Sequence, residues 1–84
     1  MASPMASAVE VAARALVDNP SEVQVTETMH RGVTVIELSV AAGDVGKVIG
    51  RQGRTAEALR TLVTATAHHH GVKATLEIRD AYGC

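Results

Sequence analysis

Apolar residues recur along this chain at two spacings, three to four residues apart in some segments and two apart in others. From Ala8 the apolar positions lie three or four apart, which predicts an amphipathic helix over residues 8–17. Asn19 precedes Pro20, and a proline disfavours helical geometry in the residue before it, so this helix should end there. A second apolar stripe predicts a long helix over residues 55–69; it comprises Leu59, Leu62, Val63, Thr66 and Ala67.

Period-two alternation of apolar and polar residues predicts strands over residues 23–29 and 72–79. A run rich in β-branched residues, with Val35 and Ile36 near its centre, predicts a third strand over residues 33–40. The short connection at Arg31-Gly32 should join the first two strands into a hairpin. Residues 45–49 are predicted as a short helix, for which Asp44 is a suitable N-cap. The predicted order is therefore helix, strand, strand, helix, helix, strand.

The length of 84 residues indicates one small domain. Residues 1–7 are rich in Ala and Ser and are expected to form a flexible N-terminus, while residues 8–80 carry the predicted elements. Residues 81–84 form a short C-terminal tail to which no role is assigned. We find no internal repeat and no low-complexity tract.

The composition limits both the size of the core and the kind of protein. Hydrophobic residues make up 46% of the chain, but there is one Tyr and no Phe or Trp, so burial per residue is modest and dimerisation is a natural way to gain more. The single thiol, Cys84, cannot form an internal disulfide, which favours a reducing compartment. No apolar run approaches the roughly 20 residues of a membrane span, and no signal peptide is evident. A cytoplasmic location is therefore expected, without a membrane partner.

Charge is distributed unevenly although the net charge is only −1. Residues 1–43 carry an excess of carboxylates, whereas residues 44–60 carry four cationic side chains and two carboxylates. The four cations are Lys47, Arg51, Arg54 and Arg60. A polyanion would bind in this region, but with few phosphate groups held we expect weak affinity and a shallow salt dependence.

The positive segment contains the run Gly50-Arg51-Gln52-Gly53, a tight turn between the short helix and the long one. Glycine permits positive φ and removes the side chain that would keep a ligand away from the backbone. A Walker A loop is excluded because Val48 follows Lys47 where a Ser or Thr is required, and the spacing of the dinucleotide fingerprint is also absent. Two interpretations remain, a helix corner without a ligand and a loop that approaches a nucleic-acid backbone.

These residues resemble a type II KH domain, in particular the small stand-alone bacterial KH proteins of the KhpA type. The resemblance covers residues 8–80 and is carried by three blocks: Ala15-Leu16-Val17-Asp18-Asn19-Pro20, Gly46-Lys47-Val48-Ile49-Gly50-Arg51-Gln52-Gly53-Arg54, and Ala58-Leu59-Arg60-Thr61. It implies an α+β fold of order α-β-β-α-α-β, in which helices pack on one face of a three-stranded mixed sheet. It also implies a GXXG-loop groove for about four unpaired nucleotides of RNA.

The resemblance further implies partners and a cellular role. Proteins that look like this form homodimers, or heterodimers with a larger KH-containing protein of the Jag (KhpB) type. The family is described as probable RNA chaperones linked to gene expression, cell shape and cell-wall homeostasis. The RNA target and the base preference do not follow from the resemblance.

The resemblance assigns RNA contact to the loop and its flanks: Lys47, Val48, Ile49, Gly50, Arg51, Gln52, Gly53 and Arg54. The two glycines would let the phosphate chain approach, the cations would hold phosphate, and Gln52 could bond backbone or base. Val48 and Ile49 should divide between the core and the groove floor, since adjacent helical side chains diverge by about 100°. Each of these cations, considered alone, could equally well be a solvated surface charge that makes no contact with RNA.

The histidines do not indicate catalysis or metal binding. Adjacent side chains in His68-His69-His70 diverge too far to hold one ion, and imidazoles at a helix C-terminus are favourable without any ligand. His30 has no evident partner, and no catalytic constellation is apparent. We therefore expect no enzyme, metal or cofactor. The rival to RNA binding is a protein-interaction module that uses exposed apolar residues on the long helix and an edge of the sheet.

Overall fold

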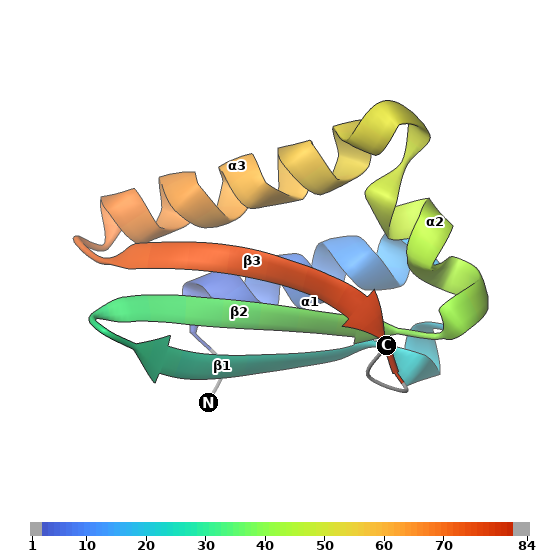
Figure 1. The fold of residues 1–84 in the computed structure, drawn as a ribbon, viewed down its shortest axis with the longest axis horizontal. Helices are drawn as coiled ribbons and strands as arrows, with labels where there is room; N and C mark the ends of the chain where they lie inside the picture. Colours follow the sequence, from blue (N-terminus) through green and yellow to red (C-terminus); the bar gives the residue numbers. More distant parts are fainter. Residues whose placement is uncertain (1–2, 82–84) are drawn as a thin grey trace.

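The computed structural model describes residues 3–81 and contains three helices and three strands in the predicted order (Figure 1). The helices are α1 (Pro4–Leu16), α2 (Val45–Ile49) and α3 (Arg54–His69). The strands are β1 (Gln24–His30), β2 (Val33–Val40) and β3 (Lys73–Asp80). Short 3₁₀ turns occupy Pro20–Glu22, Ala42–Asp44 and Arg51–Gly53.

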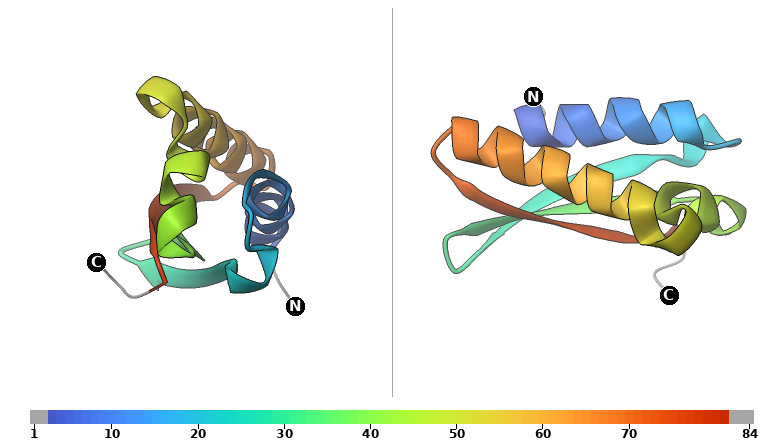
Figure 2. Two further views of the ribbon diagram at one scale, coloured as in Figure 1. Left: turned by 90° about the vertical axis from the view of Figure 1, so that its right-hand side faces the viewer. Right: turned by 90° about the horizontal axis from the view of Figure 1, so that it is seen from above.

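The sheet has the order β1-β2-β3, with β2 antiparallel to β1 and parallel to β3. The two-residue turn between β1 and β2 places Arg31 at φ 52° and Gly32 at φ 80°, the left-handed geometry that suits the twist of a tight hairpin. Both long helices lie on the same face of the sheet, with α3 against β3 and α1 beside it (Figure 2). The predicted α+β fold with a three-stranded mixed sheet is confirmed.

The core lies between β2 and the helices. Alternate residues of β2 point toward the helices and are buried: Thr34, Ile36, Leu38 and Val40. Opposite them α1 contributes Val9 and Ala13, α2 contributes Val48, and α3 contributes Leu59 and Val63. Because these side chains are small and aliphatic, the helices approach the sheet closely and the domain stays compact without Phe or Trp.

Helix α1 begins earlier than predicted. Ser3 is its N-cap, with Oγ accepting a hydrogen bond from the Ala6 amide at 3.1 Å, and Pro4 occupies the first helical position. Met5 and Ala6 are buried, so the expected flexible terminus is wrong for residues 4–7. The Ala- and Ser-rich composition concealed a helix start whose stability comes from burial.

The described part of the chain ends at Ala81. The tail predicted over residues 81–84 lies outside the described residues except for Ala81, whose amide donates to the Val40 carbonyl at 2.8 Å. Between residues 3 and 81, no helix combines the length and apolarity that crossing a membrane would require.

The elongated shape separates two ends of the molecule. The long axis measures 34 Å and runs nearly along the strands and α3 (Figure 1). Helix α2 and the loop that follows it lie at one end, and the turns β1–β2 and α3–β3 lie at the other end, separated from each other (Figure 2).

Candidate nucleic-acid interface

The loop of residues 50–53 connects α2 to α3 through a 3₁₀ turn. Gly50, Gln52 and Gly53 all have positive φ, of 77°, 57° and 72°. The Gly50 amide donates to the Gly46 carbonyl at 2.9 Å, and the Gly53 amide donates to the Gly50 carbonyl at 3.1 Å. The Arg54 amide donates to the Arg51 carbonyl, so the turn is closed by hydrogen bonds of its own backbone.

Gly50 and Gly53 are each required to be glycine for a different structural reason. A Cβ at Gly50 would overlap Oγ1 of Thr55 and lie 2.7 Å from its Cβ, whereas a Cβ at Gly53 would meet nothing within 4 Å. Gly50 is therefore required by the close packing of the corner between α2 and α3. Gly53 is required only by its left-handed backbone, and it lies beside open space that a ligand could enter.

The cations that flank the loop also differ. Arg51 and Arg54 are exposed, and among the described residues neither forms an ion pair. Lys47 Nζ lies 3.2 Å from Oδ2 of Asp18 and 3.8 Å from Oδ1 of Asp44. Two of the three predicted phosphate-binding cations are therefore available, and the third is partly neutralised by carboxylates of the protein itself.

Asp44 does not have the role predicted for it. Its backbone is helical, at φ −102° and ψ −6°, and its side chain makes no capping bond to α2. Instead the carboxylate accepts hydrogen bonds from the Asn19 amide at 3.0 Å, from Asn19 Nδ2 at 3.0 Å and from the Asp18 amide at 3.3 Å. Asp44 is 1% exposed. This carboxylate therefore joins the start of α2 to the connection between α1 and β1.

The environment of Asp44 favours its ionised form. Burial raises the pKa of its carboxyl, but hydrogen bonds from the side chain and amide of Asn19, the Asp18 amide and the charge of Lys47 together outweigh burial. The pKa therefore lies below its ordinary value of 3.8. Protonation would weaken the hydrogen bonds from Asp18 and Asn19 and remove the charge that Lys47 faces.

The apolar pair before the loop divides between two environments. Val48 is fully buried in the core, while Ile49 is half-buried beside the loop. Helix α2 contacts both α3 and β3, which holds the end of this helix beside the loop. The part of the prediction that placed one residue in the core is confirmed for Val48; the contact of Ile49 with a ligand stays a prediction.

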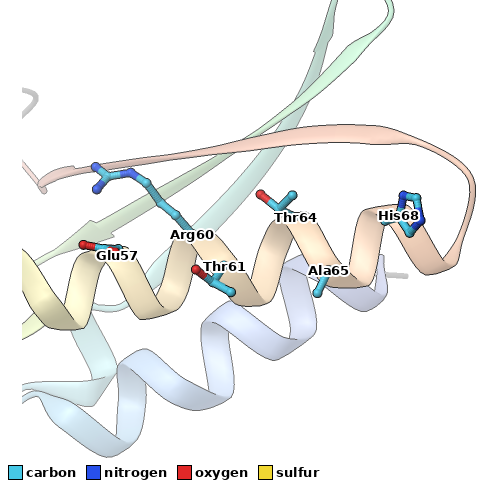
Figure 3. A pocket seen from close by; sticks show the side chains of 6 residues that line it. All are labelled: Glu57, Arg60, Thr61, Thr64, Ala65 and His68. Atoms are coloured by element: carbon cyan, nitrogen blue, oxygen red, sulfur yellow. The ribbon is translucent and has the colours of Figure 1, made fainter.

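Two depressions lie elsewhere, on the outward face of α3 (Figure 3). One has a volume of about 460 Å³ and is lined by Glu57, Arg60, Thr61, Thr64, Ala65 and His68. A second depression of about 500 Å³ continues it toward Arg54 along the same helix. Because every lining residue comes from α3, this is an open helix face, and the sequence indicated it only as exposed positions on the long helix.

The histidine-rich end of α3 forms no metal site in the part of the chain that the structure describes. No three side chains of the ligating types converge there. The rings of His69 and His70 stand nearly perpendicular, with centroids 5.3 Å apart.

The element order, the mixed sheet and the glycine loop between α2 and α3 define a KH domain of type II topology. A family model described as "KhpA/KhpB, KH domain" matches residues 6–78. The chain belongs to this KH-domain family, which is not a family of enzymes.

Several curated relatives are similar over most of their length. The RNA-binding protein KhpA of Treponema pallidum is 54% identical over 68 residues, covering 81% of this chain and 85% of that protein. The RNA-binding protein KhpA of Aquifex aeolicus is 49% identical over 72 residues, covering 86% of this chain and 91% of that protein.

Solved structures support the fold. A crystal structure of Era in complex with MgGDPNP and nucleotides 1506–1542 of 16S ribosomal RNA superposes with a TM-score of 0.64 at 18% identity. The match covers 90% of this chain and 29% of that one, so this chain corresponds to less than a third of Era. A second crystal structure, of an Aquifex aeolicus Era variant bound to GDP·AlF4−, has a TM-score of 0.62 with the same identity and coverage.

Replacing the loop glycines should separate their two roles. In Gly50→Ala the backbone strain of about 1–3 kcal/mol adds to the overlap with Thr55, so we expect the free energy of unfolding to fall by more than about 2 kcal/mol. Gly53→Ala carries only the left-handed strain and should lose about 1–2 kcal/mol. Urea unfolding followed by circular dichroism measures both, and an equal loss in the two variants would contradict the close packing at Gly50.

Replacing the buried carboxylate should change how stability depends on pH. Because the folded pKa of Asp44 lies below the unfolded value, its contribution is complete above pH 3.8 and is lost as the pH falls through the folded pKa. Asp44→Asn should therefore have a lower urea midpoint than the parent at pH 6, and the difference should narrow toward pH 3.

Asp18→Asn is the matched control, because it removes only the exposed partner of Lys47 and keeps the hydrogen bonds to Asp44. Its midpoint should stay close to that of the parent at pH 6. If the urea midpoint of Asp44→Asn lies below that of the parent by the same amount at pH 6 and at pH 3, the charge of Asp44 does not contribute to stability.

Proposed function

We propose that this protein binds single-stranded RNA in a groove bordered by the loop of residues 50–53. The observation that carries the proposal is the pair of exposed arginines, Arg51 and Arg54, which have no ion pair within the described residues and flank the open space beside Gly53. Unpaired cations beside a backbone without bulky side chains are what a phosphate chain requires. Relatives named RNA-binding protein KhpA support the same ligand class.

The geometry also supports a modest affinity. If Arg51 and Arg54 each neutralise one phosphate while Lys47 stays paired with Asp18, the affinity should fall with salt at a logarithmic slope of about −1.4. The half-buried Ile49 would pack against a base, since the chain has no Phe or Trp for stacking. Gln52 would bond either backbone or base edge.

Weak binding with little sequence preference suits a protein that remodels many RNAs. We therefore propose a role as an RNA chaperone or post-transcriptional regulator in the cytoplasm. The links to cell shape and cell-wall homeostasis stay expectations of the family resemblance.

The RNA site is tested by replacing Arg51 and Gln52 with Asp. The double variant removes one exposed cation and places two carboxylates in the loop, so affinity for short RNA oligomers should fall about tenfold or more. Amide-shift titration with random-sequence RNA tetramers measures the affinity and maps the site in one experiment. Shifts in the parent should cluster at residues 47–54.

A matched control variant has the same net charge as the loop variant. Ser7→Asp, Val11→Asp and Ser21→Asp together add the same three negative units at exposed positions away from the loop. This triple variant should bind RNA within about twofold of the parent. If the loop variant binds as well as the parent while its spectrum shows an intact fold, the groove assignment is wrong.

A second candidate function is protein interaction, and the outward face of α3 favours it. Small exposed side chains at Ala58, Thr61 and Ala65 leave an open strip along this helix, which a helix of a second molecule could approach closely (Figure 3). The description of the family model names both KhpA and KhpB, which supports a heterodimer with a larger KH-containing protein of the KhpB type. A homodimer is proposed from the open strip alone. The edges of the sheet, β1 and β3, offer a second route to pairing.

Dimerisation is tested by sedimentation velocity across a concentration series. Ala65→Arg places a long charged side chain in the strip and should shift a dimer toward monomer by about tenfold or more in dissociation constant. Val11→Arg is the control, because Val11 is 71% exposed on α1 and lies outside the strip. A parent that sediments as a monomer at every concentration would contradict the homodimer.

A further inference from the structure

Helix α2 presents three consecutive side chains in three different directions. Lys47, Val48 and Ile49 leave the helix about 100° apart, because an α-helix turns by that angle at each residue. Val48 points into the core and is fully buried. Lys47 and Ile49 therefore lie on opposite flanks of α2, and the base contact proposed above belongs to the Ile49 flank.

On its own flank, Lys47 contacts the connection between α1 and β1, which lies at the same end of the molecule as α2 (Figure 1). Its Nζ lies 3.2 Å from Oδ2 of Asp18 and 3.8 Å from Oδ1 of Asp44. Among the described residues Lys47 is the one cation within ion-pairing distance of Asp44, whereas Arg51 and Arg54 form no ion pair. The three cations around the loop are therefore not equivalent.

The shorter of these two contacts contributes less to the fold. The Asp18 side chain is 75% exposed, and an ion pair between solvated side chains contributes little, because water screens it and both side chains lose freedom. The Asp44 side chain is 2% exposed, and a buried carboxylate stays charged only with a nearby cation and hydrogen bonds. Lys47 therefore acts mainly through Asp44, at the longer distance.

Asp44 in turn determines where α2 lies. Burial raises the pKa of its carboxyl, while hydrogen bonds from Asn19 and Asp18 and the charge of Lys47 bring the pKa below its ordinary value. The ionised carboxylate accepts the hydrogen bonds that join the start of α2 to residues 18 and 19. Because α2 has only five residues, it cannot fix its own direction, and the loop follows directly at Gly50.

We propose that Lys47 is a positioning residue of the RNA site, which compensates the buried Asp44 carboxylate, keeps α2 in place and binds no phosphate. The inference rests on the proposed function and refines it: the family resemblance assigns three cations to RNA, and the geometry leaves this role to Arg51 and Arg54. A phosphate that drew Lys47 away would leave the buried carboxylate without its cation, which is the costly outcome for a buried pair. The affinity for RNA therefore depends on Lys47 through the position of the loop.

The test measures binding of a labelled oligouridylate by fluorescence anisotropy at several salt concentrations. With two arginines on phosphate, the parent should have a logarithmic salt slope of about −1.4, and Arg54→Gln should reduce it to about −0.7. Lys47→Met should keep the slope of the parent while its affinity falls about two- to fivefold, because the loop occupies its binding position less often. Lys73→Met is the matched control, since it removes the same charge from an exposed lysine at the opposite end of the molecule, and its affinity should stay within about twofold of the parent.

Asp18→Asn tests the same inference from the other side of the ion pair. It frees Lys47 from its exposed partner and leaves Asp44 in place. A positioning role predicts an unchanged salt slope, whereas a phosphate-binding Lys47 would be released toward RNA and make the slope steeper by about 0.7. The variant keeps the hydrogen bond from the amide of residue 18 to Asp44, so it decides the question even if Lys47→Met does not fold.

Two measurements without RNA separate positioning from a general loss of stability. In carbon-13 NMR titrations, Lys47→Met should raise the pKa of the Asp44 carboxyl, because a charge that lowers it is removed, and the amide resonances of residues 50–54 should shift. In double-mutant cycles read from urea midpoints, Lys47 should couple more strongly to Asp44 than to Asp18. Coupling to Asp18 alone would contradict the inference.

The salt slopes distinguish a failure of this inference from a failure of the proposed function. If the slope becomes less steep by about 0.7 in Lys47→Met, Lys47 binds phosphate, so the inference is wrong and the loop site stands. If neither the parent nor any variant binds the oligonucleotide, the proposed function fails, and Lys47 then has no RNA site to position.

Discussion

The buried carboxylate of Asp44 connects two parts of the chain that are 25 residues apart and sets where α2 begins. It accepts three hydrogen bonds from Asp18 and Asn19, and these bonds favour its ionised form. Helix α2 has only five residues and too few internal hydrogen bonds to hold its own direction. The position of the loop after α2 is therefore fixed by this carboxylate and by the burial of Val48 in the core.

The same interaction decides which cations face a ligand. Lys47 lies between Asp18 and Asp44, so part of its charge compensates the carboxylates that hold α2 in place. The free charge near the loop belongs to Arg51 and Arg54, which extend beyond the tightly packed corner at Gly50. A closely packed corner flanked by exposed arginines is suited to polyanions that vary in sequence, because contacts to phosphate groups do not depend on the bases.

The sequence predicted the elements well because their apolar patterns are regular. The β-branched residues in β2 and the stripe in α3 indicated the correct element types, and the three resemblance blocks indicated the topology. The helix start at Pro4 was missed, because Met5 and Ala6 gain stability only when the core buries them. Asp44 was predicted to cap α2 because it directly precedes that helix in the sequence. Its hydrogen-bond partners, Asp18 and Asn19, are remote in the sequence and could not be identified from it.

By itself the sequence determined the order of elements, the family and the position of the glycine loop, since these depend on local periodicity and short motifs. Only the tertiary structure decided which loop cations are free, why Gly50 and Gly53 are both glycine, and that His30 lies at the same end as the histidines of α3. Most of these depend on distances between residues that are remote in the chain. Such distances arise when the sheet and helices pack around a common core, and no local pattern contains them.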